Sequence, residues 1–157
     1  MPATELTHEA ETWRADSPTG RSVLLYDGEC GLCQFTVRWL LRHDPGGRLL
    51  FAAQQTPVAG EVFRRHSFDS AMVNSAVLVS GFATPEEELA VRSDAILGAL
   101  RVLGGGWAVL ASVARIVPRP LRDAAYRWLA RNRIRLFGKA ESCAVPTPAE
   151  RARFLEI

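Results

Sequence analysis

The chain has 157 residues, of which 48% are hydrophobic and 23% are charged, and this composition is that of an ordinary soluble domain. A chain of this length buries enough surface to fold without a metal or a disulfide. The net charge of +2 by itself indicates neither a nucleic-acid nor a membrane partner, and every apolar run is far shorter than the roughly 20 residues of a membrane span.

Residues 1–20 predict a flexible lead-in. They mix acidic residues, His8 and threonines, and they carry no apolar run of the kind found in a secretory signal. We therefore expect a cytoplasmic protein. The ordered domain is expected at residues 21–139, and residues 140–157 are expected to form a tail with a short helix.

The first predicted elements are two strands with a helix between them. The apolar run Ser22 to Tyr26 predicts a strand, which the turn residues Asp27-Gly28 end. Gly31 to His43 carries apolar residues at helical spacing around most of its circumference, so we expect a largely buried helix. The breakers Asp44-Pro45-Gly46-Gly47 end it, and Leu49 to Ala53 predicts the second strand.

The middle of the chain predicts one more helix and two more strands. A short helix is expected from Val58 to His66, a third strand from Ser75 to Ser80 and a fourth from Glu88 to Arg92. Residues 84–87 resemble a helix start, but the chain before the fourth strand is too short, so we expect a hairpin loop. Strands that alternate with helices indicate a single α/β domain.

The C-terminal third predicts helices only. Ser93 is a good N-cap for the first helix, and Gly104-Gly105-Gly106 ends it. Trp107 to Val117 predicts the second helix, and the third runs from Pro120 to about Phe137. Thr147 to Glu150 predicts a capping box for a final short helix.

The chain contains three cysteines, and two of them form a Cys-x-x-Cys pair where the first strand passes into the buried helix. Cys30 is expected at the helix N-terminus, where unpaired backbone N–H groups and the helix dipole stabilise a thiolate. Cys33 follows one turn further along on the same side, and we expect it to be the less exposed of the two. The pattern indicates a dithiol redox centre in which Cys30 attacks a substrate disulfide and Cys33 resolves the mixed disulfide.

Other uses of the cysteine pair were weighed against the redox centre. A structural disulfide between residues three apart closes a very short loop and constrains the unfolded chain little. A zinc site normally needs four ligands, and here only Cys143 and the histidines at positions 8, 43 and 66 could complete it, none at ligand spacing. Haem attachment requires a histidine directly after the second cysteine, where Gln34 stands. A small zinc protein remains an alternative.

Asp27 lies three residues before Cys30 and has two interpretations. With Gly28 it is a typical turn former. Alternatively, it is a catalytic residue that accepts the proton of Cys33 during resolution of the mixed disulfide. The neighbouring Glu29 carries a negative charge that opposes the stabilisation of a thiolate by the helix dipole.

The segment Asp27-Gly28-Glu29-Cys30-Gly31-Leu32-Cys33 resembles the DCC family of thiol-disulfide oxidoreductases. Further matches follow in the family's order: Arg42-His43-Asp44, Leu50-Phe51-Ala52, Arg92-Ser93-Asp94-Ala95, Pro118-Arg119-Pro120-Leu121-Arg122-Asp123 with Tyr126, and Asn132-Arg133 through Leu136-Phe137-Gly138 to Cys143. The resemblance implies a thioredoxin-like fold, with a central mixed four-stranded sheet flanked by helices and with extra C-terminal helices. It also implies disulfide exchange with a disulfide-containing protein or a small thiol. No bound cofactor is expected, only a thiol reductant such as glutathione.

Two features depart from thioredoxins proper. Thioredoxins have a cis-proline before the strand that faces the cysteine pair, and here Met72-Val73-Asn74 precede the strand that begins at Ser75. Glu29 stands where thioredoxins have an aromatic residue. We therefore expect substrate docking to differ from theirs.

Ser93 and Asp94 also have two interpretations. A helix cap followed by a first-turn acid explains both residue types. Alternatively, they bind substrate, because glutaredoxins look similar here and bind the γ-glutamyl end of glutathione at a comparable helix start.

Residues 115–139 contain eight basic residues and one acid, Asp123, and the basic residues alternate with apolar ones. A solvated helix face explains this pattern, and contact with a membrane surface or an acidic partner is the alternative. The rival function is thus a non-catalytic binding module whose cysteines only sense redox state. No motif for reading nucleic-acid bases accompanies the charge.

Overall fold

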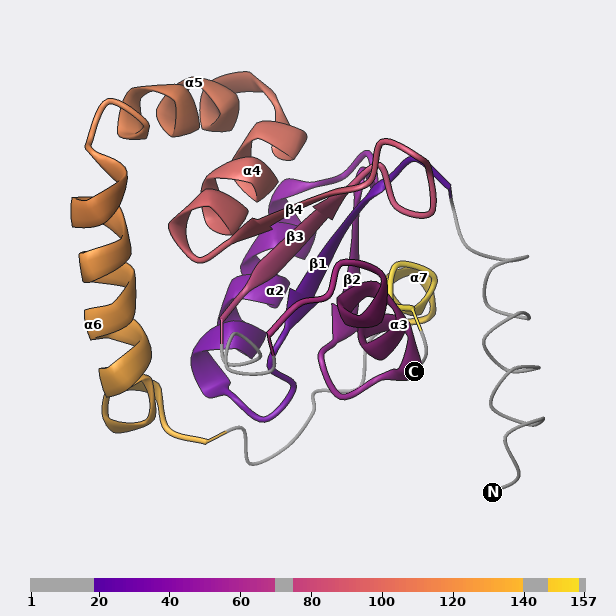
Figure 1. Ribbon diagram of the computed structural model, residues 1–157, viewed down its shortest axis with the longest axis horizontal. Helices are drawn as coiled ribbons and strands as arrows, with labels where there is room; N and C mark the ends of the chain where they lie inside the picture. Colours follow the sequence, from indigo (N-terminus) through magenta and orange to yellow (C-terminus); the bar gives the residue numbers. More distant parts are fainter. Residues whose placement is uncertain (1–18, 70–74, 140–146, 156–157) are drawn as a thin grey trace.

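The computed structural model describes residues 19–69, 75–139 and 147–155 (Figure 1). Its strands are β1 (Ser22–Tyr26), β2 (Leu49–Ala53), β3 (Val77–Ser80) and β4 (Glu88–Val91). They form one mixed sheet in the order β2-β1-β3-β4, in which β1 and β2 are parallel and the other pairs are antiparallel. The mixed four-stranded sheet expected from the sequence is confirmed.

Helices cover both faces of this sheet: α2 (Gly31–His43), α3 (Pro57–Arg65), α4 (Ser93–Leu103), α5 (Gly105–Ala114), α6 (Arg119–Phe137) and α7 (Pro148–Arg151). Alternate residues of β1 face opposite sides, because successive side chains of a strand point in opposite directions. Val23 and Leu25 join the core cluster that includes α3, and Leu24 joins the cluster that includes α2 and α4. The result is the α/β architecture that the thioredoxin-like resemblance implies.

The extra C-terminal helices form an outer layer. Figure 1 shows α5 leading from α4 to α6, and α6 running along the side of the molecule away from α3 and α7. α6 packs against α2 and α4, so its inner face lies close to the start of α2. None of the helices in the described part of the chain is long and apolar enough to cross a membrane.

Most predicted boundaries agree with the structure to within two residues. The exception is the end of α5, which was expected at Val117 and lies at Ala114. Smaller differences lie around α4. Ser93 was expected to be the N-cap, but it is the first helical residue, and Arg92, at a φ of 54°, occupies the cap position. The Ser93 hydroxyl donates to α6 instead of capping its own helix. The glycine run was expected to separate two helices, but α5 already begins at Gly105, and only Gly104, at a φ of 77°, lies between them.

The C-terminal segment packs onto the edge of the sheet. The predicted capping box is present, since the Thr147 side chain and the backbone N–H of Glu150 bond to each other at the start of α7. Beyond it, the N–H of Phe51 donates to the Arg153 carbonyl at 2.9 Å, and the N–H of Leu155 donates to the Phe51 carbonyl at 2.8 Å. These bonds extend the pairing outward from β2.

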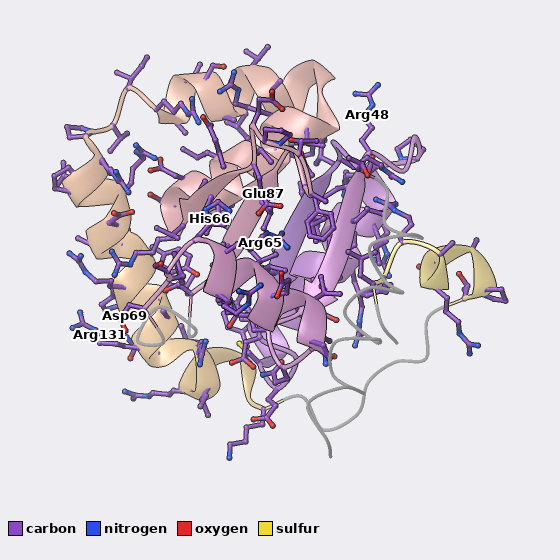
Figure 2. The ribbon with its side chains drawn as sticks, turned by 45° about the vertical axis from the view of Figure 1, so that its right-hand side comes forward. Arg48, Arg65, His66, Asp69, Glu87 and Arg131 are labelled. Atoms are coloured by element: carbon purple, nitrogen blue, oxygen red, sulfur yellow. The ribbon has the colours of Figure 1, made fainter. Side chains whose placement is uncertain are left out.

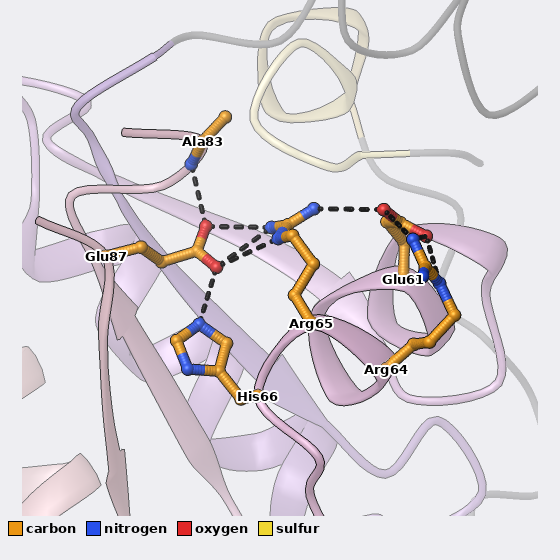
Figure 3. Close-up of polar contacts among 6 residues, drawn as sticks. All are labelled: Glu61, Arg64, Arg65, His66, Ala83 and Glu87. Carbon is orange, nitrogen blue, oxygen red and sulfur yellow. Dashed lines mark hydrogen bonds and ion pairs between the residues drawn. The ribbon is translucent and has the colours of Figure 1, made fainter. Parts of the chain in front are cut away.

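One carboxylate ties the β3–β4 hairpin to the end of α3 (Figures 2 and 3). Glu87 lies 2.8 Å from the Arg65 guanidinium and 2.7 Å from the His66 ring, and it accepts the backbone N–H of Ala83 at 2.7 Å. Burial opposes ionisation of Glu87, but these three donors outweigh it, so the pKa of this carboxyl lies below its ordinary value. The cluster therefore ties the hairpin to α3, which lies on the face of the sheet opposite α2.

Candidate functional site

Cys30 and Cys33 lie at the N-terminus of α2, directly after β1, as the sequence predicts. Cys30 is the residue before the first helical turn, with extended backbone (φ −96°, ψ 121°), and its carbonyl accepts the N–H of Gln34 at 3.0 Å. Both thiols are free, and their side chains hydrogen-bond to each other. The structure therefore brings the pair into contact as a dithiol.

The exposure of the two thiols is the reverse of the expectation. Cys30 is only 4% exposed, whereas Cys33 is half-buried, so the prediction that Cys33 is the less exposed was wrong. The end of α6 covers Cys30, and Lys139 forms a β-bridge with it. A Cβ built on Gly31 would lie 2.8 Å from the carbonyl oxygen of Phe137, so the two backbones approach as closely as a glycine permits. The covering residues are far along the chain, where no local pattern connects them to the pair.

Burial raises the pKa of the Cys33 thiol to about 12, and Cys30 adds to the rise through its charge and its hydrogen bond. The backbone of Asp27 and the positive charge of Arg133 act in the opposite direction and are outweighed. Cys33 is therefore held as a thiol at neutral pH.

The Asp27 carboxylate holds the turn between β1 and α2 together. Its Oδ1 accepts the backbone N–H of Glu29 at 3.0 Å and the side-chain amide of Gln55 at 3.1 Å. On Oδ2, the guanidinium of Arg133 lies 3.3 Å away and links the turn to α6. These contacts are those of a turn former, and the proton-acceptor role stays a prediction. The sequence indicated Arg133 as part of the family signature and as one of many basic residues, but no local pattern connected it to Asp27, so this pairing was missed.

Ser93 and Asp94 face α6 from the first turn of α4. The Ser93 hydroxyl donates to Asp123 at 2.5 Å and is the main reason that the pKa of Asp123 is lowered. Asp94 pairs with Arg122 at 2.8 Å and with Arg119 at 3.1 Å. Part of the basic segment therefore anchors α6 to α4, and it is not simply a solvated face. The predicted role of Ser93 and Asp94 in binding substrate stays a prediction.

A cavity of about 490 Å³ lies beside Cys33, between α2, α4 and α6. Most of its wall is aliphatic, and it includes Leu32, Ile96, Leu97, Val117 and Leu129. Cys30 is not among the residues that line it. The cavity therefore gives access to the pair from the Cys33 side.

Tyr126 also lines this cavity, and the sequence indicated it only as part of the family signature. Its hydroxyl accepts the backbone N–H of Ala76 at 2.8 Å. Burial raises the pKa of Tyr126, and negative charge on Cys33 acts in the same direction, so the hydroxyl lies within electrostatic reach of the thiols. Tyr126 thus ties α6 to the residue before β3, and it lines the same cavity as Cys33.

Metal ligands do not gather around the pair in the part of the chain that the structure describes. Within these ranges, no three His, Cys, Asp or Glu side chains form a group that could hold a metal ion. Cys143 and His8, which were weighed as further zinc ligands, lie outside the described residues, as do Met72, Val73 and Asn74.

Comparison with known proteins identifies the family. Residues 24–139 match the family described as "DCC1-like thiol-disulfide oxidoreductase". The chain belongs to this family. The match begins in β1, includes both cysteines and ends at Lys139, which bridges to Cys30. The resemblance read from the sequence motifs is thereby confirmed.

Two curated relatives of this DCC1-like chain extend the match. The uncharacterized protein YuxK of Bacillus subtilis (strain 168) is 30% identical over 133 residues, which cover 85% of this chain and 93% of the relative. The DCC family protein At1g52590, chloroplastic, of Arabidopsis thaliana is 28% identical over 123 residues, which cover 78% of this chain and 69% of the relative. No solved structure matches the chain significantly.

Proposed function

We propose that this DCC1-like protein exchanges thiols and disulfides through Cys30 as the nucleophile and Cys33 as the resolving thiol. The observation that carries the proposal is the contact between two free thiols at the N-terminus of α2. Backbone N–H groups at a helix start favour an anion, which suits an attacking thiolate at Cys30. Cys33, with its pKa raised by burial, keeps its proton until the mixed disulfide has formed.

The proposed cycle moves two electrons. The Cys30 sulfur bonds to one sulfur of the substrate disulfide and releases the other as a thiol. Cys33 then loses its proton and attacks the Cys30 sulfur, which releases the second substrate thiol. The pair ends as a disulfide, and the substrate has gained two electrons and two protons. A thiol reductant such as glutathione returns the pair to the dithiol, so no bound cofactor is required.

A redox titration tests this proposal. The purified protein is equilibrated in glutathione buffers, its free thiols are trapped by alkylation, and its mass is measured. We expect Cys30 and Cys33 to interconvert as one couple with a potential between about −270 and −120 mV. The matched variants are Cys30→Ser, which should lose turnover, and Cys33→Ser, which should accumulate a mixed disulfide with glutathione. A Cys143→Ser control should leave the titration unchanged.

Two results would overturn the redox centre. A pair that stays locked in one state across all buffers would assign a structural role to the cysteines. A pair that resists alkylation until a chelator is added would assign a metal site. The binding-module function would be favoured by two results together. The wild-type protein would show no turnover, and Cys30→Ser would still bind the membrane surface or acidic partner that the wild-type protein binds.

We propose contact with an anionic membrane surface as a second function, carried by α5, α6 and the loop between them. All the exposed large apolar side chains in the described residues, apart from Phe35, lie on this surface: Val109, Leu110, Val113, Ile116, Val117, Leu121, Trp128, Ile134, Leu136 and Phe137. Ile116 is 80% exposed. Basic side chains lie among them on the same segment, including Arg131 (Figure 2). Exposed apolar groups mixed with arginines suit a negatively charged lipid surface.

Vesicle flotation tests the membrane proposal. We expect the protein to float with vesicles rich in phosphatidylglycerol and not with pure phosphatidylcholine. An Ile116→Ser/Trp128→Ser variant should lose the binding, whereas Phe35→Ser, which removes an exposed ring elsewhere, should keep it. Absence of binding, together with self-association in sedimentation that the same double variant abolishes, would assign the surface to a second copy of the chain.

A further inference from the structure

The two sides of the cysteine pair differ in what can approach them. On the Cys30 side, the backbone at the end of α6 covers the thiol, and Cys30 is only 4% exposed. On the other side, Cys33 lines the cavity of about 490 Å³. Because the two thiols hydrogen-bond to each other, a molecule in contact with Cys33 lies next to the Cys30 sulfur as well. The cavity therefore offers an approach to the pair that does not require α6 to move.

The wall of the cavity defines the chemistry of an occupant. Leu24 of β1, Leu32 of α2, Ile96 and Leu97 of α4, and Leu129 of α6 line it with aliphatic side chains. Apolar groups gain free energy by leaving water for such a wall, whereas charged groups without partners lose it.

The charged group in the lining is already engaged. Arg122 donates to Asp94 at 2.8 Å and to Ser93 at 3.4 Å, so its charge is balanced within the chain. A peptide with several charges, such as oxidised glutathione, would have to break these bonds or bury its charges unpaired. The volume falls within the range of sites for small molecules.

We infer that this cavity binds the apolar body of a small disulfide and presents its S–S bond to Cys30 and Cys33. The inference rests on the proposed function and names its substrate class. The Cys30 sulfur bonds to one substrate sulfur, and the substrate S–S bond breaks. Cys33 then displaces the bound sulfur, which closes the Cys30–Cys33 disulfide. Two electrons and two protons pass from the pair to the substrate, and a cyclic disulfide leaves as a single dithiol.

Binding is tested without chemistry. In the Cys30→Ser/Cys33→Ser variant, no exchange can occur, and isothermal titration calorimetry with lipoamide, an apolar cyclic disulfide, reports the cavity alone. Ala125 is an exposed residue that lines the cavity, so Ala125→Phe should obstruct it and weaken binding by about tenfold or more. Ala124 is the matched control, because it is exposed, adjacent and not part of the lining. Ala124→Phe should bind lipoamide as the parent variant does.

Turnover is tested next in the protein with both cysteines. We expect a higher kcat/KM for lipoamide than for oxidised glutathione, and we expect Ala125→Phe to reduce the lipoamide value while Ala124→Phe keeps it. Binding of lipoamide without turnover of any disulfide would overturn the proposed function and leave a binding site. Turnover of glutathione disulfide without lipoamide binding would overturn this inference alone. Binding of disulfide peptides with apolar side chains to the Cys30→Ser/Cys33→Ser variant, without binding of lipoamide, would overturn the small-molecule class in favour of a protein substrate.

Discussion

Gly31 is the residue at which the end of α6 meets the start of α2. An alanine here would place its Cβ 2.8 Å from the Phe137 carbonyl oxygen and 3.0 Å from that of Gly138. Backbone atoms cannot move aside as a flexible side chain can, so we expect Gly31→Ala to lower the free energy of unfolding by about 1–3 kcal/mol. Urea denaturation measures this change. Displacement of α6 should also speed alkylation of Cys30 in the folded protein.

Gly60 provides the matched control for Gly31. It lies inside α3, and nothing stands within 4 Å of the position that a Cβ would take. Gly60→Ala should therefore raise the free energy of unfolding by about 0.5–1 kcal/mol, because alanine loses less conformational entropy in a helix. If Gly31→Ala were as stable as Gly60→Ala, the close approach of α6 to α2 would be wrong.

Asp27→Asn separates the two interpretations of Asp27. Asparagine keeps an acceptor for the N–H of Glu29 and loses the charge that faces Arg133. A base that accepts the Cys33 proton would slow resolution by about 10²-fold or more when removed. We expect the exchange rate of Asp27→Asn to differ little from that of the wild-type protein at any pH, because both carboxylate oxygens of Asp27 already accept from other donors. Stopped-flow measurement of mixed-disulfide resolution decides, and a large loss at every pH would restore the catalytic role.

At the scale of an element, the pairing of Glu87 with α3 makes the hairpin sensitive to acid. The pKa of Glu87 is lowered from its ordinary value of 4.5, so the folded protein binds this proton less tightly than the unfolded chain does. Its carboxylate therefore contributes stability that is present above pH 4.5 and is lost as the pH falls through the lower folded pKa. Glu87→Gln should lower the free energy of unfolding at neutral pH by about 1–3 kcal/mol.

The deficit of Glu87→Gln should shrink as the pH falls through the lowered folded pKa of Glu87, because the wild-type carboxyl then becomes protonated as well. Urea denaturation at neutral pH and over a series of pH values below 4.5 measures this change. Glu86→Gln is the control, since Glu86 is the exposed neighbour, and its effect should stay within about 0.5 kcal/mol. An equal deficit for Glu87→Gln at all of these pH values would contradict the contribution of its charge.

The elements that the sequence predicted are those whose signals are local. The apolar run of β1 and the apolar spacing of α2 gave their boundaries, and the turn at Asp27 located Cys30 at the helix start. The packing of α6 could not be predicted in this way. Its anchors, such as the Arg133–Asp27 and Arg122–Asp94 pairs, join residues far apart in the chain. Because α6 covers Cys30, the relative exposure of the thiols was also beyond local reasoning.

At the scale of the whole molecule, burial is concentrated around the sheet. The two core clusters draw on β1, β2 and β3 with α2, α3 and α4. By contrast, Ala111 is the one buried residue of α5 and Asp123 that of α6. An element with few buried contacts opens at lower free energy than the core. The stability of the molecule is therefore expected to be uneven, with α5 and α6 less protected than the sheet and the helices α2, α3 and α4.

Hydrogen exchange followed by mass spectrometry measures this unevenness. We expect amides of α5 and α6 to exchange at least about tenfold faster than those of β1, β2 and β3, and to do so without global unfolding. Opening of α6 uncovers Cys30, so its alkylation rate should follow α6 exchange and not strand exchange as urea is added. Gly31→Ala should accelerate both the exchange of α6 amides and the alkylation of Cys30. The strand amides should still exchange only through global unfolding, whose free energy is lower in this variant. Exchange of α6 only together with the strands would mean that the covering of Cys30 is part of the core, and a protein substrate could then reach this thiol only through global unfolding.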